Sequence, residues 1–169
     1  MHLHKDALKF LCFDRQTVLV LCWSIGLTLG IYFGFEIASP ISSYLWQAGR
    51  TALKFPIITT VFPIVLIWLF VWRALPGMIY PIIFMKAFTD GIVMVGIAYA
   101  FGSATWLFGP IYLISDRLAT VICLFFAARC LESGGFKMHR CFALCLATTI
   151  TASLLDYAFI SPYFASLML

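Results

Sequence analysis

Residues 16–35 form a mainly apolar stretch that contains no charged side chain. A transmembrane helix needs about 20 consecutive, mainly apolar residues, and this stretch has that length. A secretory signal peptide is the competing interpretation, but its apolar region would be unusually long and no small-x-small cleavage site follows residue 35 cleanly. We therefore expect an uncleaved membrane anchor here.

The rest of the chain is also rich in apolar residues and poor in charged ones. Of its 169 residues, 63% are hydrophobic and only 11% are charged, whereas soluble domains carry about 25% charged residues. The connections are too short to form a separate soluble catalytic domain. We predict an all-α integral membrane protein in which residues 1–169 form one polytopic domain, a bundle of about five transmembrane helices in a lipid bilayer. The predicted spans lie near 16–35, 55–72, 78–101, 107–128 and 141–160.

One or two interfacial helices are expected beside these spans. Residues 1–14 fit either a short helix in the membrane interface or a frayed polar lead-in. Residues 36–54 form the longest connection, in which we expect a break near Pro40 and a half-helix over 43–54. Its polar and aromatic side chains are candidates either for contact with a partner or for ordinary anchoring at the headgroup level, namely Tyr44, Trp46, Arg50 and Lys54.

The distribution of basic residues predicts the orientation. With the N-terminus in the cytoplasm, the inner segments hold Lys5, Lys9, Arg15, Arg73, Arg129, Lys137 and Arg140, and the outer segments hold Arg50 and Lys54. Cytoplasmic segments carry an excess of Lys and Arg, so this count favours a cytoplasmic N-terminus and an external C-terminus. The net charge of +4 is therefore attributed to topology, and no nucleic-acid partner is expected.

Glycines recur every four residues in the first span, at Gly26, Gly30 and Gly34. Small residues at this spacing let two helix backbones approach closely. The spacing fits packing within the bundle, which we favour, and also fits association of two chains. The oligomeric state stays open.

Charged residues inside the apolar spans are the most specific local signal, because charges near the bilayer midplane are costly. Lys86 and Asp90 lie four residues apart on one helical face. Asp116 and Arg117 enter from the opposite side to a similar depth, so we expect an interhelical cluster with the third span. The cluster fits either a neutralised set that fixes helix register or an ion or proton path. With Asp156 it comprises Lys86, Asp90, Asp116, Arg117 and Asp156.

Catalytic patterns are missing from the sequence. No HExxH, P-loop or GxSxG motif occurs, and no Ser-His or Cys-His pair can be argued. His139, Cys141 and Cys145 resemble part of a metal site, but no second ligand pair stands at a suitable spacing. We expect no enzymatic activity, no cofactor and no metal.

Two short segments resemble the stage II sporulation protein M family of bacterial membrane proteins. The first, Lys86-Ala87-Phe88-Thr89-Asp90-Gly91, corresponds to a Lys-small-Phe-x-x-Gly segment that opens a core span of the family. The second contains Gly109-Pro110-Ile111 and Ser115-Asp116 before a long aliphatic run. The resemblance covers about half of the chain, residues 57–131. Asp90 and the Asp116-Arg117 pair depart from the family pattern.

The resemblance implies a non-enzymatic component of the bacterial cell membrane. In endospore formers, the family member is the membrane platform for stage II sporulation proteins D and P, which remodel peptidoglycan during engulfment of the forespore. The chain would then be a scaffold that anchors or recruits peptidoglycan-remodelling membrane proteins. The alternative is a small transporter, or a transporter subunit, that uses the intramembrane charge cluster.

Overall fold

The computed structural model describes the backbone of residues 14–52, 56–102, 114–133, 138–155 and 158. Side chains are described for 14–36, 60–99, 102, 117–132, 139–155 and 158. All regular structure in these ranges is helical, which confirms the predicted all-α class for this part of the chain. The elements are α2 (Arg15–Ala52), α3 (Pro56–Trp72), the short 3-10 helix η1 (Pro76–Met78), α4 (Ile79–Phe101), α6 (Ile114–Ser133) and α7 (Met138–Leu155).

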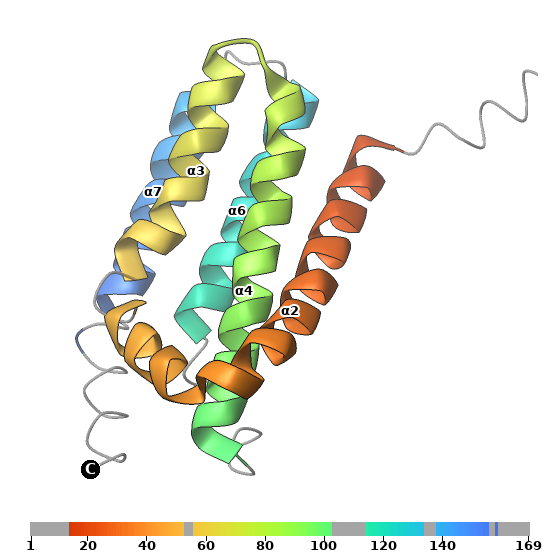
Figure 1. Ribbon diagram of the computed structural model, residues 1–169. Helices are drawn as coiled ribbons and strands as arrows, with labels where there is room; N and C mark the ends of the chain where they lie inside the picture. The colour runs from red at the N-terminus through yellow and green to blue at the C-terminus, as the bar shows by residue number, and fades with distance from the viewer. Residues whose placement is uncertain (1–13, 53–55, 103–113, 134–137, 156–157, 159–169) are drawn as a thin grey trace, which may run out of the picture.

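Four helices, α3, α4, α6 and α7, lie side by side, and the chain direction alternates from each to the next (Figure 1). The fifth helix, α2, lies outside this group and packs mainly on α4. Buried apolar side chains from all five helices meet in one core cluster, among them Leu19, Ile64, Ile83, Phe126 and Cys145. The fold is therefore a helical bundle with a single core.

Helix α2 is longer than the sequence predicted. The expected break and the separate half-helix over 43–54 are wrong, because α2 is helical throughout Arg15–Ala52. Figure 1 shows that the helix changes direction in its second half and crosses the lower part of α4 toward the start of α3. Pro40 lies in that half, and a proline inside a helix bends it without necessarily ending it. Lys54 and residues 1–13 lie outside the described residues.

The boundaries of the later helices differ from the prediction by a few residues. α4 ends at Phe101, as expected from Gly102, which takes a positive φ of 54° at the cap. α6 continues to Ser133, five residues beyond the predicted end at 128. Because Cys130 and Leu131 are buried while Glu132 is exposed, this turn still packs on the bundle despite its polar sequence. α7 begins at Met138, three residues before the predicted start.

A tight turn joins α3 to α4. The Leu75 N–H bonds the Phe70 carbonyl at 2.8 Å, and the Ala74 N–H bonds the Val71 carbonyl at 3.0 Å. These two bonds define a Schellman motif, in which the residue after the cap takes a left-handed conformation. Ala74 has that conformation, with φ 57°. The motif reverses the chain within a few residues and sets α4 beside α3.

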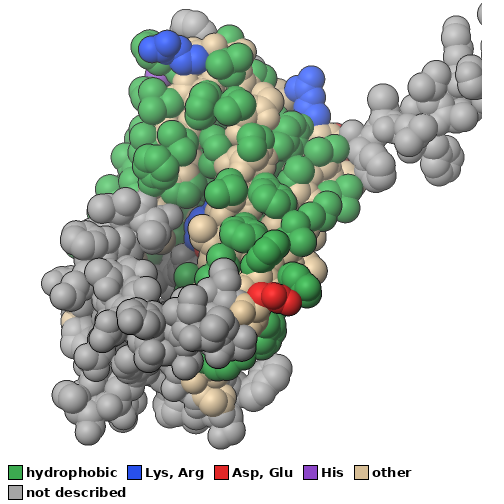
Figure 2. All heavy atoms as spheres, in the orientation of Figure 1, with side chains coloured by type: hydrophobic (Ala, Val, Ile, Leu, Met, Phe, Trp, Pro, Cys, Tyr) green, Lys and Arg blue, Asp and Glu red, His purple; other side chains and the backbone are tan. Residues whose placement is uncertain are grey.

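Basic side chains gather at one end of the bundle (Figure 2). Arg15 at the start of α2 donates to the Leu131 carbonyl near the end of α6, at 3.0 Å. The Trp68 ring near the end of α3 contacts the His139 ring at the start of α7, with centroids 6.2 Å apart. These contacts bring four arginines to this end, which we call the basic end: Arg15, Arg73, Arg129 and Arg140.

The side surface of the bundle is mainly apolar, as the view in Figure 2 shows. Large hydrophobic side chains are exposed on every helix, including Tyr32 on α2, Val121 on α6 and Leu144 on α7. Two helical stretches are long and apolar enough to cross a membrane, Arg15–Glu36 and Pro76–Tyr99. Two shorter apolar helices, Thr60–Trp72 and His139–Leu155, accompany them.

Candidate functional site

The two charged residues of α4 form a buried ion pair. Lys86 and Asp90 stand four residues apart, so successive helical turns place them on the same face. The Lys86 Nζ donates to Asp90 Oδ1, and the two side chains are only 5% and 4% exposed. An ion pair removed from solvent in this way is costly to form and still more costly to disrupt, because removal of one partner leaves the other charge buried.

A hydroxyl group from α6 completes the pair. Thr120 is buried and its Oγ1 donates to Asp90 Oδ2 at 2.9 Å. Both carboxylate oxygens of Asp90 therefore have partners, one on its own helix and one on a neighbouring helix. The Lys86–Asp90–Thr120 group carries no net charge and joins α4 to α6 through a hydrogen bond to a charged acceptor.

A second polar contact joins α3 to α7. The hydroxyls of Thr60 and Ser153 lie 2.9 Å apart, and both side chains are buried. At a rise of 1.5 Å per residue, Asp90, Thr120, Thr60 and Ser153 all lie about 17–23 Å from the basic end. The structure thus contains a polar layer at mid-height, crossed by two hydrogen-bonded contacts between helices.

The layer also contains polar atoms without partners. Thr149 is fully buried, yet its Oγ1 has no hydrogen-bond partner among the described residues. Arg117 is half-buried on α6, and its Nη2 atom is likewise without a partner in the described part of the chain. Burying a hydroxyl or a guanidinium without a hydrogen bond costs folding free energy, and no described contact offsets that cost at these two positions.

The expected charge cluster is only partly described. Lys86 and Asp90 pair within α4, and among the described side chains the Thr120 hydroxyl links the pair to α6. Asp116 lies in the first turn of α6, but its side chain is not described, and Asp156 lies outside the described residues. Sequence reasoning found the ion pair through its charges. It missed Thr120 because threonine is common in apolar helices and gives no signal by itself.

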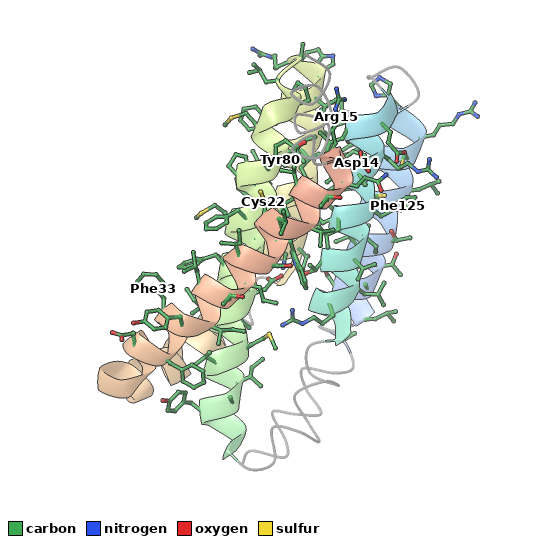
Figure 3. The ribbon with its side chains drawn as sticks, turned by 90° about the vertical axis from the view of Figure 1, so that its right-hand side faces the viewer. Asp14, Arg15, Cys22, Phe33, Tyr80 and Phe125 are labelled. Carbon is green, nitrogen blue, oxygen red and sulfur yellow. The ribbon has the colours of Figure 1, made fainter. Side chains whose placement is uncertain are left out.

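The three glycines of α2 face α4 and are buried. A methyl group added at Gly30 would lie 2.1 Å from the Phe88 carbonyl oxygen, and one at Gly26 would lie 2.5 Å from the Phe84 carbonyl oxygen. Figure 3 shows α2 running obliquely, from Asp14 and Arg15 near the end of α6 to Phe33 beside α4. The glycine face is thus occupied within the chain, which leaves it unavailable to a second copy.

The predicted partner contacts cannot be placed as side chains. Tyr44, Trp46 and Arg50 belong to the second half of α2, where only the backbone is described, and Lys54 is outside the description. In the described ranges, no group of three or more His, Cys, Asp or Glu side chains has the geometry of a metal site. Five cysteines are free thiols there, Cys22, Cys123, Cys130, Cys141 and Cys145.

Two threonine variants test the role assigned to the Asp90–Thr120 contact. Thr120→Val should lower the free energy of unfolding by about 1.5–3 kcal/mol, because it removes a hydrogen bond to a charged group. Thr149→Val is the matched control: its hydroxyl has no partner among the described residues, so the change should be neutral or stabilising by up to about 1 kcal/mol. Thermal unfolding of the two variants in detergent measures the difference. Equal losses would contradict the assignment.

No protein-family model, curated protein or solved structure matches this chain. The class of protein therefore follows from the fold and the polar layer alone. These define an all-helical bundle whose side surface is apolar and whose interior holds a neutral, hydrogen-bonded ion pair. The Lys86–Asp90–Thr120 group can fix the register of two helices.

Proposed function

We propose that this chain is a multi-pass membrane protein that acts as a non-enzymatic scaffold. In this proposal, α2, α3, α4, α6 and α7 are five transmembrane spans. The basic end faces the cytoplasm together with the N-terminus, and the C-terminus is outside. The resemblance to the stage II sporulation protein M family suggests the role, which is to anchor or recruit peptidoglycan-remodelling partners in a bacterial cell membrane during spore engulfment.

The main support for membrane insertion is that a charged pair is buried and large apolar side chains are exposed, the reverse of the arrangement in a water-soluble protein. The described Lys86–Asp90 pair is buried, whereas large apolar side chains are exposed along every helix. Among the described residues, exposed charges lie at the ends of the apolar stretches. Arg73, Arg129 and Arg140 are at the basic end, and Glu36 ends the apolar stretch of α2. In water this surface would promote aggregation, whereas in a bilayer it meets lipid chains and headgroups at the appropriate levels.

The described partners of Asp90 favour a scaffold over a transporter. A transport site needs groups that exchange partners with a substrate or an ion during the cycle. Here, both oxygens of Asp90 already have protein partners, Lys86 and Thr120. Such a group stabilises one arrangement of α4 and α6, as a rigid platform for partner proteins requires.

Membrane insertion and topology are tested by cysteine labelling in intact cells. The full chain should resist extraction by alkaline carbonate. In a variant without the native cysteines, Cys introduced at Leu75, in the exposed α3–α4 turn, should react with a membrane-impermeant maleimide only after the cells are opened. Labelling of Leu75→Cys in intact cells would reverse the orientation, and release of the chain by carbonate would refute membrane insertion.

The scaffold role is tested by co-purification from the native membrane in mild detergent, followed by mass spectrometry. Recovery of cell-wall hydrolases or their membrane anchors supports the proposal. Recovery of an ATPase pair or another energising module would refute it and favour the transporter. Asp90→Asn gives the complementary test, because a folded variant that loses substrate or proton coupling also identifies a transporter.

A further inference from the structure

One corner of the basic end combines aromatic rings with basic side chains, where α3 ends and α7 begins. The Arg73 guanidinium lies 5.7 Å from the centroid of the Trp72 ring, and Trp72 stacks on Trp68 with centroids 6.2 Å apart. Trp68 in turn stacks on Phe142 at 4.8 Å and contacts His139 edge-on at 6.2 Å. These five side chains form a continuous series that we call the Trp–Arg corner.

The corner carries positive charge that the described residues do not neutralise. Arg73 and Arg140, which follows His139 in the sequence, are exposed, and no described acid lies within salt-bridge distance of either. The first turn of α7 contains His139 and Arg140 but no acidic residue. Because the N-terminus of a helix itself carries a partial positive charge, this placement is electrostatically unfavourable without an anion nearby.

The α6 side of the same end is arranged differently. Arg129 lies 3.5 Å from Glu132 in a salt bridge and stacks over the Phe125 ring. Figure 3 shows Phe125 on α6, near the start of α2. Arg129 therefore has an acidic partner of its own. Arg73 and Arg140 at the Trp–Arg corner, by contrast, are not paired with any described acid.

We propose that the Trp–Arg corner binds the phosphate headgroup of an anionic phospholipid. This inference rests on the proposed membrane insertion and adds the class of lipid to it. Arginine forms forked hydrogen bonds with phosphate oxygens, and tryptophan prefers the level of the headgroups. Half-buried Trp68 and Phe142 offer an apolar surface for the start of an acyl chain. Basic pockets on the cytoplasmic side of membrane proteins commonly bind such headgroups.

Lipid binding to the delipidated full chain in detergent tests the inference. Phosphatidylglycerol and phosphatidylcholine with the same acyl chains are titrated separately, and bound lipid is counted by native mass spectrometry. The wild-type chain should retain phosphatidylglycerol preferentially. Arg73→Gln/Arg140→Gln should bind phosphatidylglycerol about thirtyfold more weakly, because it removes two basic groups near the headgroup. Arg129→Gln is the matched control and should bind within about twofold of wild type.

Three results would overturn the inference. The first is equal retention of the two lipids by the wild-type chain, which needs no variant to interpret. The second is an equal loss of affinity in Arg129→Gln and in the double variant. The third is displacement of phosphatidylglycerol by an equimolar amount of inorganic phosphate, which would make the corner a phosphate site. Membrane insertion is measured separately by carbonate extraction, so its failure is distinguishable from an absence of lipid selectivity.

Discussion

Replacing Asp90 with alanine is expected to lower the free energy of unfolding by about 3–5 kcal/mol, the cost of removing one partner from a buried ion pair. The change removes the carboxylate that neutralises Lys86 and deprives the Thr120 hydroxyl of its acceptor. Lys86→Met should cost a similar amount, because it leaves the carboxylate buried without its cation. Unfolding of the purified chain in detergent, by heat or by denaturant, measures both losses.

The double variant Lys86→Met/Asp90→Leu distinguishes an ion pair from a general intolerance of substitution. Replacement of both charges by apolar groups of similar volume is often neutral or stabilising. The double variant should therefore be more stable than either single variant, with a coupling energy of about 2 kcal/mol or more. Strictly additive losses would contradict the pairing of Lys86 with Asp90.

The helical class could be predicted because mainly apolar runs of about 20 residues leave few alternatives. Residues 78–101 illustrate this, since the observed α4 spans Ile79–Phe101 and Gly102 stops it through its positive φ. The ion pair was also accessible, because Lys86 and Asp90 share a helical face by their spacing alone. In these cases a local rule and the tertiary structure agree.

The second half of α2 could not be predicted, because Pro40 and two serines are equally compatible with a helix end and with a bent helix. The continued helix differs from the broken one in its direction and its packing, and neither is visible in local composition. The hydrogen bond from Thr120 to Asp90 could not be predicted from the sequence for a related reason. Which hydroxyl on α6 faces Asp90 depends on the rotation of α6 about its axis. The sequence of α6 has no distinct apolar face that would fix this rotation.

Gly91→Ala is expected to disrupt the packing of α2 on α4. A methyl group added at Gly91 would lie 2.6 Å from the Leu27 carbonyl oxygen and 2.7 Å from the Ile31 nitrogen. These are backbone atoms, which cannot rotate away as a side chain would, so α2 has to move. Overpacking of this kind costs about 1–3 kcal/mol, and more where the obstacle is rigid. Thermal unfolding in detergent and the distance between spin labels on α2 and α4 measure the effect.

Gly96→Ala is the matched control, because it makes the same change on the same helix. A methyl group added at Gly96 meets no atom within 4 Å, and alanine is the better helix former by about 1 kcal/mol. Gly96→Ala should therefore leave the α2–α4 distance unchanged and slightly raise the unfolding temperature. An equal loss of stability in both variants would mean that helix flexibility, rather than close contact with α2, explains the glycines of α4. Since α2 packs mainly on α4, loss of this contact weakens the attachment of α2 to the bundle.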